Sequence, residues 1–152
     1  MKRPLSADYP GRIPEDWENR IKPRLLREFP NILLVDDSEF LSDILATFFR
    51  LEGFSAVAAC GGLAALKAVE KQVPDIAFID IVMPDLGGLE VAKRIRATAR
   101  GKAPLLVALS GWHEQEVRDD AKSAGFDHFL IKPVDPASLR QFLSGLSTNL
   151  PE

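Results

Sequence analysis

Four short apolar runs constrain the fold of this 152-residue chain more than any other feature of its sequence. The runs cover residues 32–35, 76–79, 105–109 and 129–131, and none of them alternates between apolar and polar residues. Continuous apolar runs of this length are typical of strands that are buried on both faces of a sheet. Each run is followed at once by residues with useful chemistry, which are in chain order Asp36 and Asp37, Asp80, Ser110, and Lys132.

Segments with the spacing of amphipathic helices separate these runs. The spacing is clear in four segments, at residues 41–48, 63–69, 89–95 and 139–146. The first of them follows a helix-capping residue, Ser38. A weaker helix is expected around residues 114–123, and another strand near residues 55–59. Strands that alternate with helices of about ten or more residues predict βαβ units, so we expect an α/β fold with five such units and a parallel sheet.

The polar residues at the strand ends are expected to meet at one edge of this sheet. In open parallel sheets, ligands bind beyond the carboxyl ends of the strands, where the strand order reverses. Neighbouring carboxylates repel one another by several kcal/mol at an effective dielectric constant of about 20. Asp36, Asp37 and Asp80 therefore need a cation, a proton or Lys132 beside them. Hard oxygen ligands with room left for water suit Mg²⁺.

A carboxylate beside Mg²⁺ and an ammonium group is also a competent phosphoryl acceptor. The metal ion and Lys132 would offset the charge on the phosphoryl oxygens while Asp80 attacks in line. Ser110 would donate a hydrogen bond to the transferred group. The pocket thus predicts phosphoryl chemistry at Asp80.

Each of these residues has a simpler interpretation when it is taken singly. An aspartate after a strand, such as Asp36 or Asp37, is usually a turn former or a helix cap. Lys132 alone would be a solvated lysine, and Ser110 with Gly111 would be a turn. The agreement of order and spacing at all four strand ends favours the shared site.

Four motifs contain the polar residues, and together they are highly specific. They read LVDDS at residues 34–38, DIVMP at 80–84 followed by GGLE at 87–90, ALSG at 108–111, and GFDHFLIKP at 125–133. Through these motifs, residues 31–146 resemble the receiver domain of two-component response regulators, the CheY-like family. The stretch 125–136 also resembles receivers that are attached to hybrid sensor kinases or work with them. The chain is therefore similar to a stand-alone or a hybrid-kinase-type receiver.

The resemblance implies a fold and a phosphorylation site. The fold is a doubly wound (βα)5 arrangement, whose parallel sheet has the flavodoxin-like order 2-1-3-4-5 with helices on both faces. Asp80 would be the phosphoacceptor and would form an acyl phosphate in a Mg²⁺-dependent reaction. The phosphoryl group would come from a histidine kinase or a histidine phosphotransfer protein. Asp37 would bind Mg²⁺ directly and Asp36 mainly through water, while Asp80 and the backbone carbonyl of Val82 would complete the protein ligands.

The resemblance also implies how the phosphoryl group is sensed. Lys132 would pair with the phosphoryl oxygens, and its peptide bond to Pro133 is expected to be cis. Ser110 and Phe129 match the family's switch pair, in which the hydroxyl moves toward the phosphoryl group and the aromatic ring follows inward. This change would act on the face formed by the fourth helix, fifth strand and fifth helix, at about residues 114–146. That face would bind a downstream protein partner or form a homodimer.

The implied activity is signalling rather than enzymatic turnover, because the domain would catalyse only its own phosphorylation and dephosphorylation. Two apolar residues, Val82 and Trp112, flank the expected phosphoryl site, where side chains affect how water reaches the acyl phosphate. We therefore predict slow dephosphorylation. Serine stands at position 110, where the family more often has threonine, and it keeps the hydroxyl.

Two other function classes compete with a phosphorylated receiver. A receiver-like interaction module that works without phosphorylation is the open alternative, although every acidic residue of the site is kept. A hydrolase fits poorly, because haloacid-dehalogenase-type phosphatases need a second Asp two residues after the nucleophile, where this chain has Val82. Nucleotide-binding α/β proteins need a glycine-rich loop after the first strand, and residues 36–40 do not form one.

Residues 1–30 differ in composition from the rest of the chain. They contain five of the eleven prolines and seven of the nineteen Lys and Arg residues. Frequent proline blocks long helices, but Pro14 suits the first position of a short helix over residues 15–21. We expect a partly ordered N-terminal extension with apolar residues able to pack on the domain or on a partner. These residues are Trp17, Ile21, Leu25 and Leu26.

The receiver domain is expected over residues 31–148, with no output domain after it. The net charge of −3 does not favour contact with nucleic acid or membrane. The apolar runs are far too short to span a membrane, and the first residues lack the apolar stretch of a signal peptide. A single cysteine, Cys60, excludes an intrachain disulfide. These features predict a cytoplasmic protein. Its two histidines, His113 and His128, are interpreted as surface or support residues.

Overall fold

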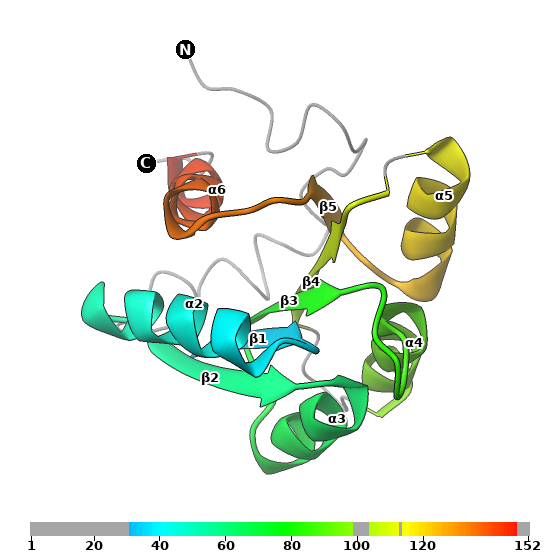
Figure 1. Ribbon diagram of the computed structural model, residues 1–152, viewed down its shortest axis with the longest axis horizontal. Coiled ribbons are helices and arrows are strands. Elements are labelled where there is room, and N and C mark those ends of the chain that lie inside the picture. The colour runs from blue at the N-terminus through cyan, green and yellow to red at the C-terminus, as the bar shows by residue number, and fades with distance from the viewer. Residues whose placement is uncertain (1–30, 99–103, 113, 149–152) are drawn as a thin grey trace.

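The computed structural model describes residues 31–98, 104–112 and 114–148. Its strands form one parallel sheet in the order β2-β1-β3-β4-β5 (Figure 1). The strands are β1 (Asn31–Asp36), β2 (Ser55–Cys60), β3 (Ile76–Asp80), β4 (Leu105–Ser110) and β5 (His128–Ile131). The predicted α/β class and the strand order 2-1-3-4-5 are confirmed.

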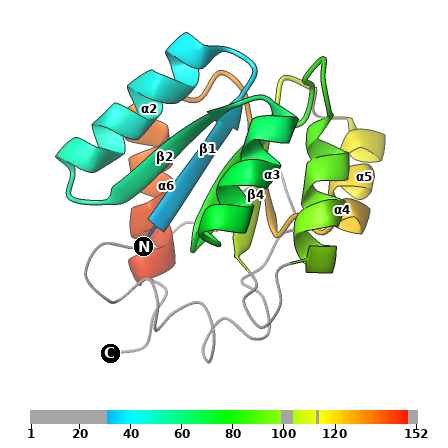
Figure 2. The same cartoon turned by 90° about the horizontal axis from the view of Figure 1, so that it is seen from below.

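Helices cover both faces of the sheet. They are α2 (Glu39–Leu51), α3 (Gly62–Lys71), α4 (Gly88–Thr98), α5 (Gln115–Ala124) and α6 (Pro136–Thr148). Figure 2 shows α2 and α6 on one face and α3, α4 and α5 on the other. For α2 to α5 this division follows from the strand order. The crossover from β1 to β2 runs in one direction across the sheet and the next three run in the other, and right-handed crossovers of opposite direction lie on opposite faces.

The buried strands supply two separate cores through alternate residues. In β1, Leu33 and Val35 pack with residues of α3, α4 and α5, whereas Ile32 and Leu34 pack with residues of α2 and α6. All four side chains are at most 3% exposed. Because successive side chains of a strand point to opposite faces, a strand that is buried on both sides must be apolar throughout. This explains why the strand sequences do not alternate.

Phe78 of β3 fixes the helices of the α2 and α6 layer to the centre of the sheet. Its ring stacks on Phe49 of α2 with the centroids 6.1 Å apart, and it meets Phe142 of α6 edge-on at 6.0 Å. Each such aromatic pair contributes about 0.5–1.5 kcal/mol beyond the area that it buries. The strand that ends in Asp80 is thereby packed against both helices of this layer.

His128 is fully buried at the start of β5, with its ring edge-on to Phe142 at 5.2 Å. Neither ring nitrogen has a hydrogen-bond partner among the described residues. Burial lowers the pKa of His128 to about 4, so the ring is neutral at physiological pH. The residue supports the core, which agrees with one of the two roles expected for it.

Some predictions concern parts of the chain outside the described ranges. The N-terminal extension of residues 1–30 and His113 both lie there. The proposed domain limits of 31–148 therefore stay a prediction. Within the described ranges, no helix is both long enough and apolar enough to cross a membrane.

Candidate functional site

Three carboxylates meet at the carboxyl edge of the sheet, where the strand order reverses. Asp36 ends β1 and Asp80 ends β3, and these strands are direct neighbours in the sheet. One carboxylate oxygen from each of Asp36, Asp37 and Asp80 lies within 4.8 Å of the other two. Asp36 and Asp80 are only 7% and 5% exposed, whereas Asp37 is exposed. The group therefore has a buried floor and one side open to solvent.

Lys132 joins this group from the far side of β4. Its ammonium nitrogen lies 2.9 Å from Asp80 Oδ2 and 3.2 Å from Asp36 Oδ2. The backbone holds the residue in place, because the amide of Lys132 donates a 2.8 Å hydrogen bond to the carbonyl of Ser110. The peptide bond to Pro133 is cis, as predicted.

Backbone amides hold the other oxygen of each buried carboxylate. The amide of Ser38 donates to Asp36 Oδ1 at 2.8 Å, and the amide of Val82 donates to Asp80 Oδ1 at 3.3 Å. Ser38 is also the helix cap, as predicted, because its Oγ accepts a 3.3 Å hydrogen bond from the amide of Leu41 at the start of α2. The turn that begins α2 thus orients Asp36, whereas the loop after β3 orients Asp80.

The electrostatics of the pocket are dominated by burial and by Lys132. Burial raises the pKa of Asp80, and the hydrogen bond and charge of Lys132 offset this shift only in part. Burial alone would lower the pKa of Lys132, but its hydrogen bond and ion pairs with Asp80 and Asp36 leave that pKa raised. Lys132 is therefore a stable cation, but its single positive charge does not balance the three carboxylates of the pocket.

The donor set fits a Mg²⁺ ion. Three carboxylates and one ammonium group give a formal charge of −2 (three negative minus one positive) within one pocket. The oxygen atoms are hard ligands, and the exposed side of Asp37 leaves room for the waters that Mg²⁺ usually retains. A divalent cation would balance this charge.

Ser110 and Phe129 lie on neighbouring strands and point to the same face of the sheet. In the β4–β5 register, Phe129 is paired with Ala108, two residues before Ser110, so the two side chains are diagonal neighbours. Both are buried. Ser110 Oγ accepts a 3.0 Å hydrogen bond from the amide of Trp112, and the guanidinium of Arg118 lies over the Phe129 ring at 5.6 Å. The aromatic ring thus connects the pocket edge to α5.

One residue of the site region escaped the sequence analysis. Asp85, in the loop after Asp80, accepts hydrogen bonds from the amides of Gly62 at 3.2 Å and Leu63 at 3.1 Å. The hydrogen bonds that the Asp85 carboxylate accepts, above all the one from the amide of Leu63, lower the pKa of Asp85. Asp85 therefore caps α3 from another part of the chain. The sequence signal for this contact was that α3 begins at two glycines, Gly61 and Gly62, which have no side chain to cap the helix.

Comparison with known proteins places this geometry in a family. Residues 32–144 match the family described as the response regulator receiver domain. The chain belongs to this family. It is therefore a receiver domain of two-component response regulators, as the motifs at its strand ends indicated.

Individual relatives agree with this assignment. An uncharacterized 14.6 kDa protein of Leptolyngbya boryana is 33% identical over 109 residues, which cover 72% of this chain and 83% of that protein. The regulatory protein VanRc of Enterococcus gallinarum is 31% identical over 69% of this chain and 44% of its own length, so the receiver spans less than half of that relative. Among solved structures, chemotaxis protein CheY4 of Vibrio cholerae has a TM-score of 0.72 at 25% identity, covering 78% of this chain and 98% of that one.

Proposed function

We propose that this receiver accepts a phosphoryl group on Asp80, in a Mg²⁺-dependent reaction, from a histidine kinase or a histidine phosphotransfer protein. The observation that carries the proposal is the contact of Lys132 with Asp80 and Asp36 inside a group of three carboxylates. This arrangement has a nucleophile, a fixed cation and a set of metal ligands at one point. Signalling by phosphorylation needs these parts, and the domain performs no turnover of a separate substrate.

The transfer is a displacement at phosphorus. A carboxylate oxygen of Asp80 forms a bond to phosphorus while the bond from phosphorus to the donor's imidazole nitrogen breaks, and the imidazole leaves as a neutral ring after taking up a proton. Lys132 exchanges its contact with Asp80 Oδ2 for the phosphoryl oxygens. Mg²⁺, held by Asp36, Asp37, Asp80 and the Val82 carbonyl, would neutralise negative charge on those oxygens when bound.

The phosphoryl group then acts on the neighbouring strand. The Ser110 hydroxyl turns from the amide of Trp112 toward the new oxygens, and the space that it leaves is taken by movement of the Phe129 ring. The added charge of about −1.5 to −2, by analogy with other phosphorylated side chains, thereby changes the face formed by α5, β5 and α6. This face binds a downstream protein partner or a second copy of the receiver.

A protein donor is supported by apolar side chains beside the pocket. Helix α2 begins three residues after Asp36, and its solvent side carries exposed Phe40, Leu41 and Ile44. Exposed apolar groups that gather on one helix indicate contact with a protein. A receiver that takes its phosphoryl group from such donors is expected in the cytoplasm, which is the location that we propose.

Hydrogen–deuterium exchange before and after treatment with acetyl phosphate and Mg²⁺ tests the proposed switch. We expect exchange to change in α5, β5 and α6 and to stay constant in α3, which serves as an internal reference. Asp80→Asn is the matched control and should show no change. The alternative, an interaction module that works without phosphorylation, predicts identical exchange in the parent and the variant under all conditions.

A further inference from the structure

A groove lies between the edge strand β2 and helix α3, away from the acidic pocket. It has a volume of about 380 Å³. One end of the groove lies where β1, β2 and β3 begin, and it is lined there by Asn31, Ser55 and Pro74. The phosphoacceptor lies at the opposite ends of these strands. The groove therefore has no part in the phosphoryl chemistry.

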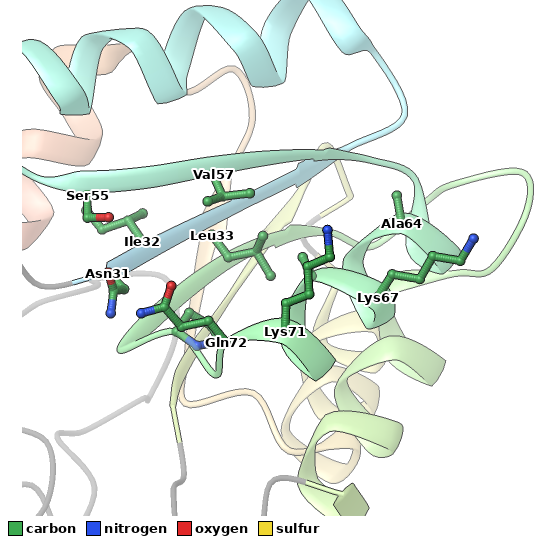
Figure 3. Close-up of a pocket in the computed structure, with 11 residues that line it drawn as sticks. Asn31, Ile32, Leu33, Ser55, Val57, Ala64, Lys67, Lys71 and Gln72 are labelled. Carbon is green, nitrogen blue, oxygen red and sulfur yellow. The ribbon is translucent and has the colours of Figure 1, made fainter.

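The walls of the groove combine an apolar floor with a positive rim. Leu33 and Val57 face α3, from which Lys67 and Lys71 extend (Figure 3). The lysines are one helical turn apart and exposed, and no described residue forms an ion pair with either. The residues that line the groove include no carboxylate. A suitable occupant therefore carries large apolar side chains next to acidic ones.

The chain itself contains such a segment, a short distance before Asn31 in the sequence. Residues 15–21 read EDWENRI, so that Trp17 and Ile21 are four positions apart and acidic residues surround the tryptophan. In a helix, residues four apart lie on one face, and acidic residues in the first turn are favourable. The segment thus offers an apolar pair for the floor of the groove and, with three acidic residues against Arg20, a net negative charge for its lysine rim.

Chain connectivity brings this segment to the groove at a high local concentration. The first described residue, Asn31, is itself part of the groove lining. The nine residues 22–30 that join the segment to Asn31 can span at most ~30 Å, and the ten residues of α3 extend for ~15 Å. The segment therefore reaches any point along the groove. A short linker of this kind gives an effective concentration in the millimolar range, which favours this segment over a second copy or a separate peptide.

We propose that residues 15–21 of this chain dock in the groove between β2 and α3, with Trp17 and Ile21 on the apolar floor and the acidic residues beside Lys67 and Lys71. The docking is intramolecular and independent of phosphorylation at Asp80. It gives the N-terminal extension a fixed position at the β2 edge of the sheet, opposite the β5 edge.

Quenching of Trp17 fluorescence by acrylamide tests the proposal in the full-length chain. Trp112→Phe leaves Trp17 as the single tryptophan, and an isolated peptide of residues 11–30 gives the quenching constant of the undocked segment. We expect the chain to show at least a twofold lower quenching constant than the peptide. The constant should rise toward the peptide value in Lys67→Glu/Lys71→Glu and in Ala64→Phe, which fills the groove from α3.

Matched variants separate docking from general effects of charge or folding. Lys93→Glu/Lys122→Glu changes two exposed lysines on α4 and α5 and should leave Trp17 protected. Replacing Glu15, Asp16 and Glu18 by lysine in the Lys67→Glu/Lys71→Glu chain should restore protection. The proposal is overturned if Trp17 in the parent chain is quenched as readily as in the peptide, or if its protection ignores the groove variants. Protection that disappears on dilution would assign the segment to a second copy and would equally overturn it.

Discussion

Lys132 Nζ lies 2.9 Å from Asp80 Oδ2, although Asp80 ends β3, Lys132 follows β5, and β4 lies between these two strands. The same ammonium group lies 3.2 Å from Asp36 Oδ2. One cation therefore contacts both buried carboxylates of the pocket and leaves the acidic group with excess negative charge. This relationship supports the roles that we propose for Asp80, as the phosphoacceptor and as a metal ligand.

Removal of the Lys132 ammonium should slow phosphorylation of Asp80. Lys132→Ala loses a charge-assisted contact with the phosphoryl oxygens, and such contacts contribute about 1.5–3 kcal/mol, so we expect a loss of roughly tenfold to a hundredfold in rate. Rapid-quench measurement with acetyl phosphate and Mg²⁺ provides the rate. Lys93→Ala, at an exposed position of α4, is the control and should react like the parent. Equal rates for the two variants would remove Lys132 from the mechanism.

Mg²⁺ affinity should fall as the pH is lowered into the range where the carboxylate of Asp80 takes up a proton. Burial raises the pKa of Asp80 above its usual 3.8, so protons compete with the metal ion at a higher pH than at an ordinary aspartate. Below the raised pKa, the apparent affinity should fall by about tenfold per pH unit for one competing proton. Calorimetric titration at several pH values measures this dependence. Asp80→Asn should bind more weakly with a flatter pH profile, and an affinity in the parent that is independent of pH would contradict the expectation.

The same shift has a stability consequence without Mg²⁺. A carboxyl group whose folded pKa is raised favours the folded state at low pH, and this contribution is lost as the pH rises through the folded pKa. Added Mg²⁺ should therefore increase the melting temperature at neutral pH more than at acidic pH.

His128 should make the fold sensitive to acid. Its pKa is about 4 in the folded state against 6.5 in the unfolded state, so the unfolded chain binds more protons between these values. Stability is full above about pH 6.5 and declines by about 3 kcal/mol as the pH falls to about 4. Urea unfolding at about pH 7 and about pH 4.5 should reveal this loss. His128→Leu removes no side-chain hydrogen bond among the described residues and should reduce this loss of stability at low pH. An unchanged loss in the variant would assign the acid sensitivity to other groups.

Val82 and Trp112 should prolong the lifetime of the acyl phosphate. Both side chains are exposed beside the pocket, at 63% and 62%, and neither carries a carboxylate or amide that orients water. Val82→Asn supplies such a group, and we expect phosphate loss to accelerate by roughly tenfold, which corresponds to about 1.4 kcal/mol. Following phosphate release from the phosphorylated domain measures the effect. Val82→Ile is the matched apolar control, and an unchanged rate in Val82→Asn would refute this explanation.

Much of the fold was predictable because the buried strands have a simple physical signature. A strand covered on both faces needs apolar residues at every position, and β1, β3 and β4 show this pattern in sequence. The meeting of the polar residues at the strand ends then follows, because the carboxyl ends of parallel strands share one edge of the sheet. Strand order came from the family resemblance, since the apolar pattern is the same for any order.

The burial of α2 shows where sequence patterns lose information. Apolar spacing predicted the helix, yet Leu41 and Ile44 lie exposed, and the buried side chains of the helix are Ser42, Leu45, Ala46 and Phe49. Both sides of the helix carry apolar residues, so the pattern does not distinguish the core from a contact surface. The cap that Asp85 provides for α3 was equally hidden, because it joins segments distant in the chain.

Intact mass measurement after incubation with acetyl phosphate tests the central claim most directly. We expect the parent chain to gain the mass of one phosphoryl group with Mg²⁺ present and to gain none when the metal is removed by a chelator. Asp80→Asn should gain none in either condition, whereas Asp37→Asn should react only slowly because it weakens the metal site. A parent chain that gains no phosphoryl group from acetyl phosphate or from any phosphorylated histidine donor, or an Asp80→Asn chain that gains one as readily as the parent, would contradict the account.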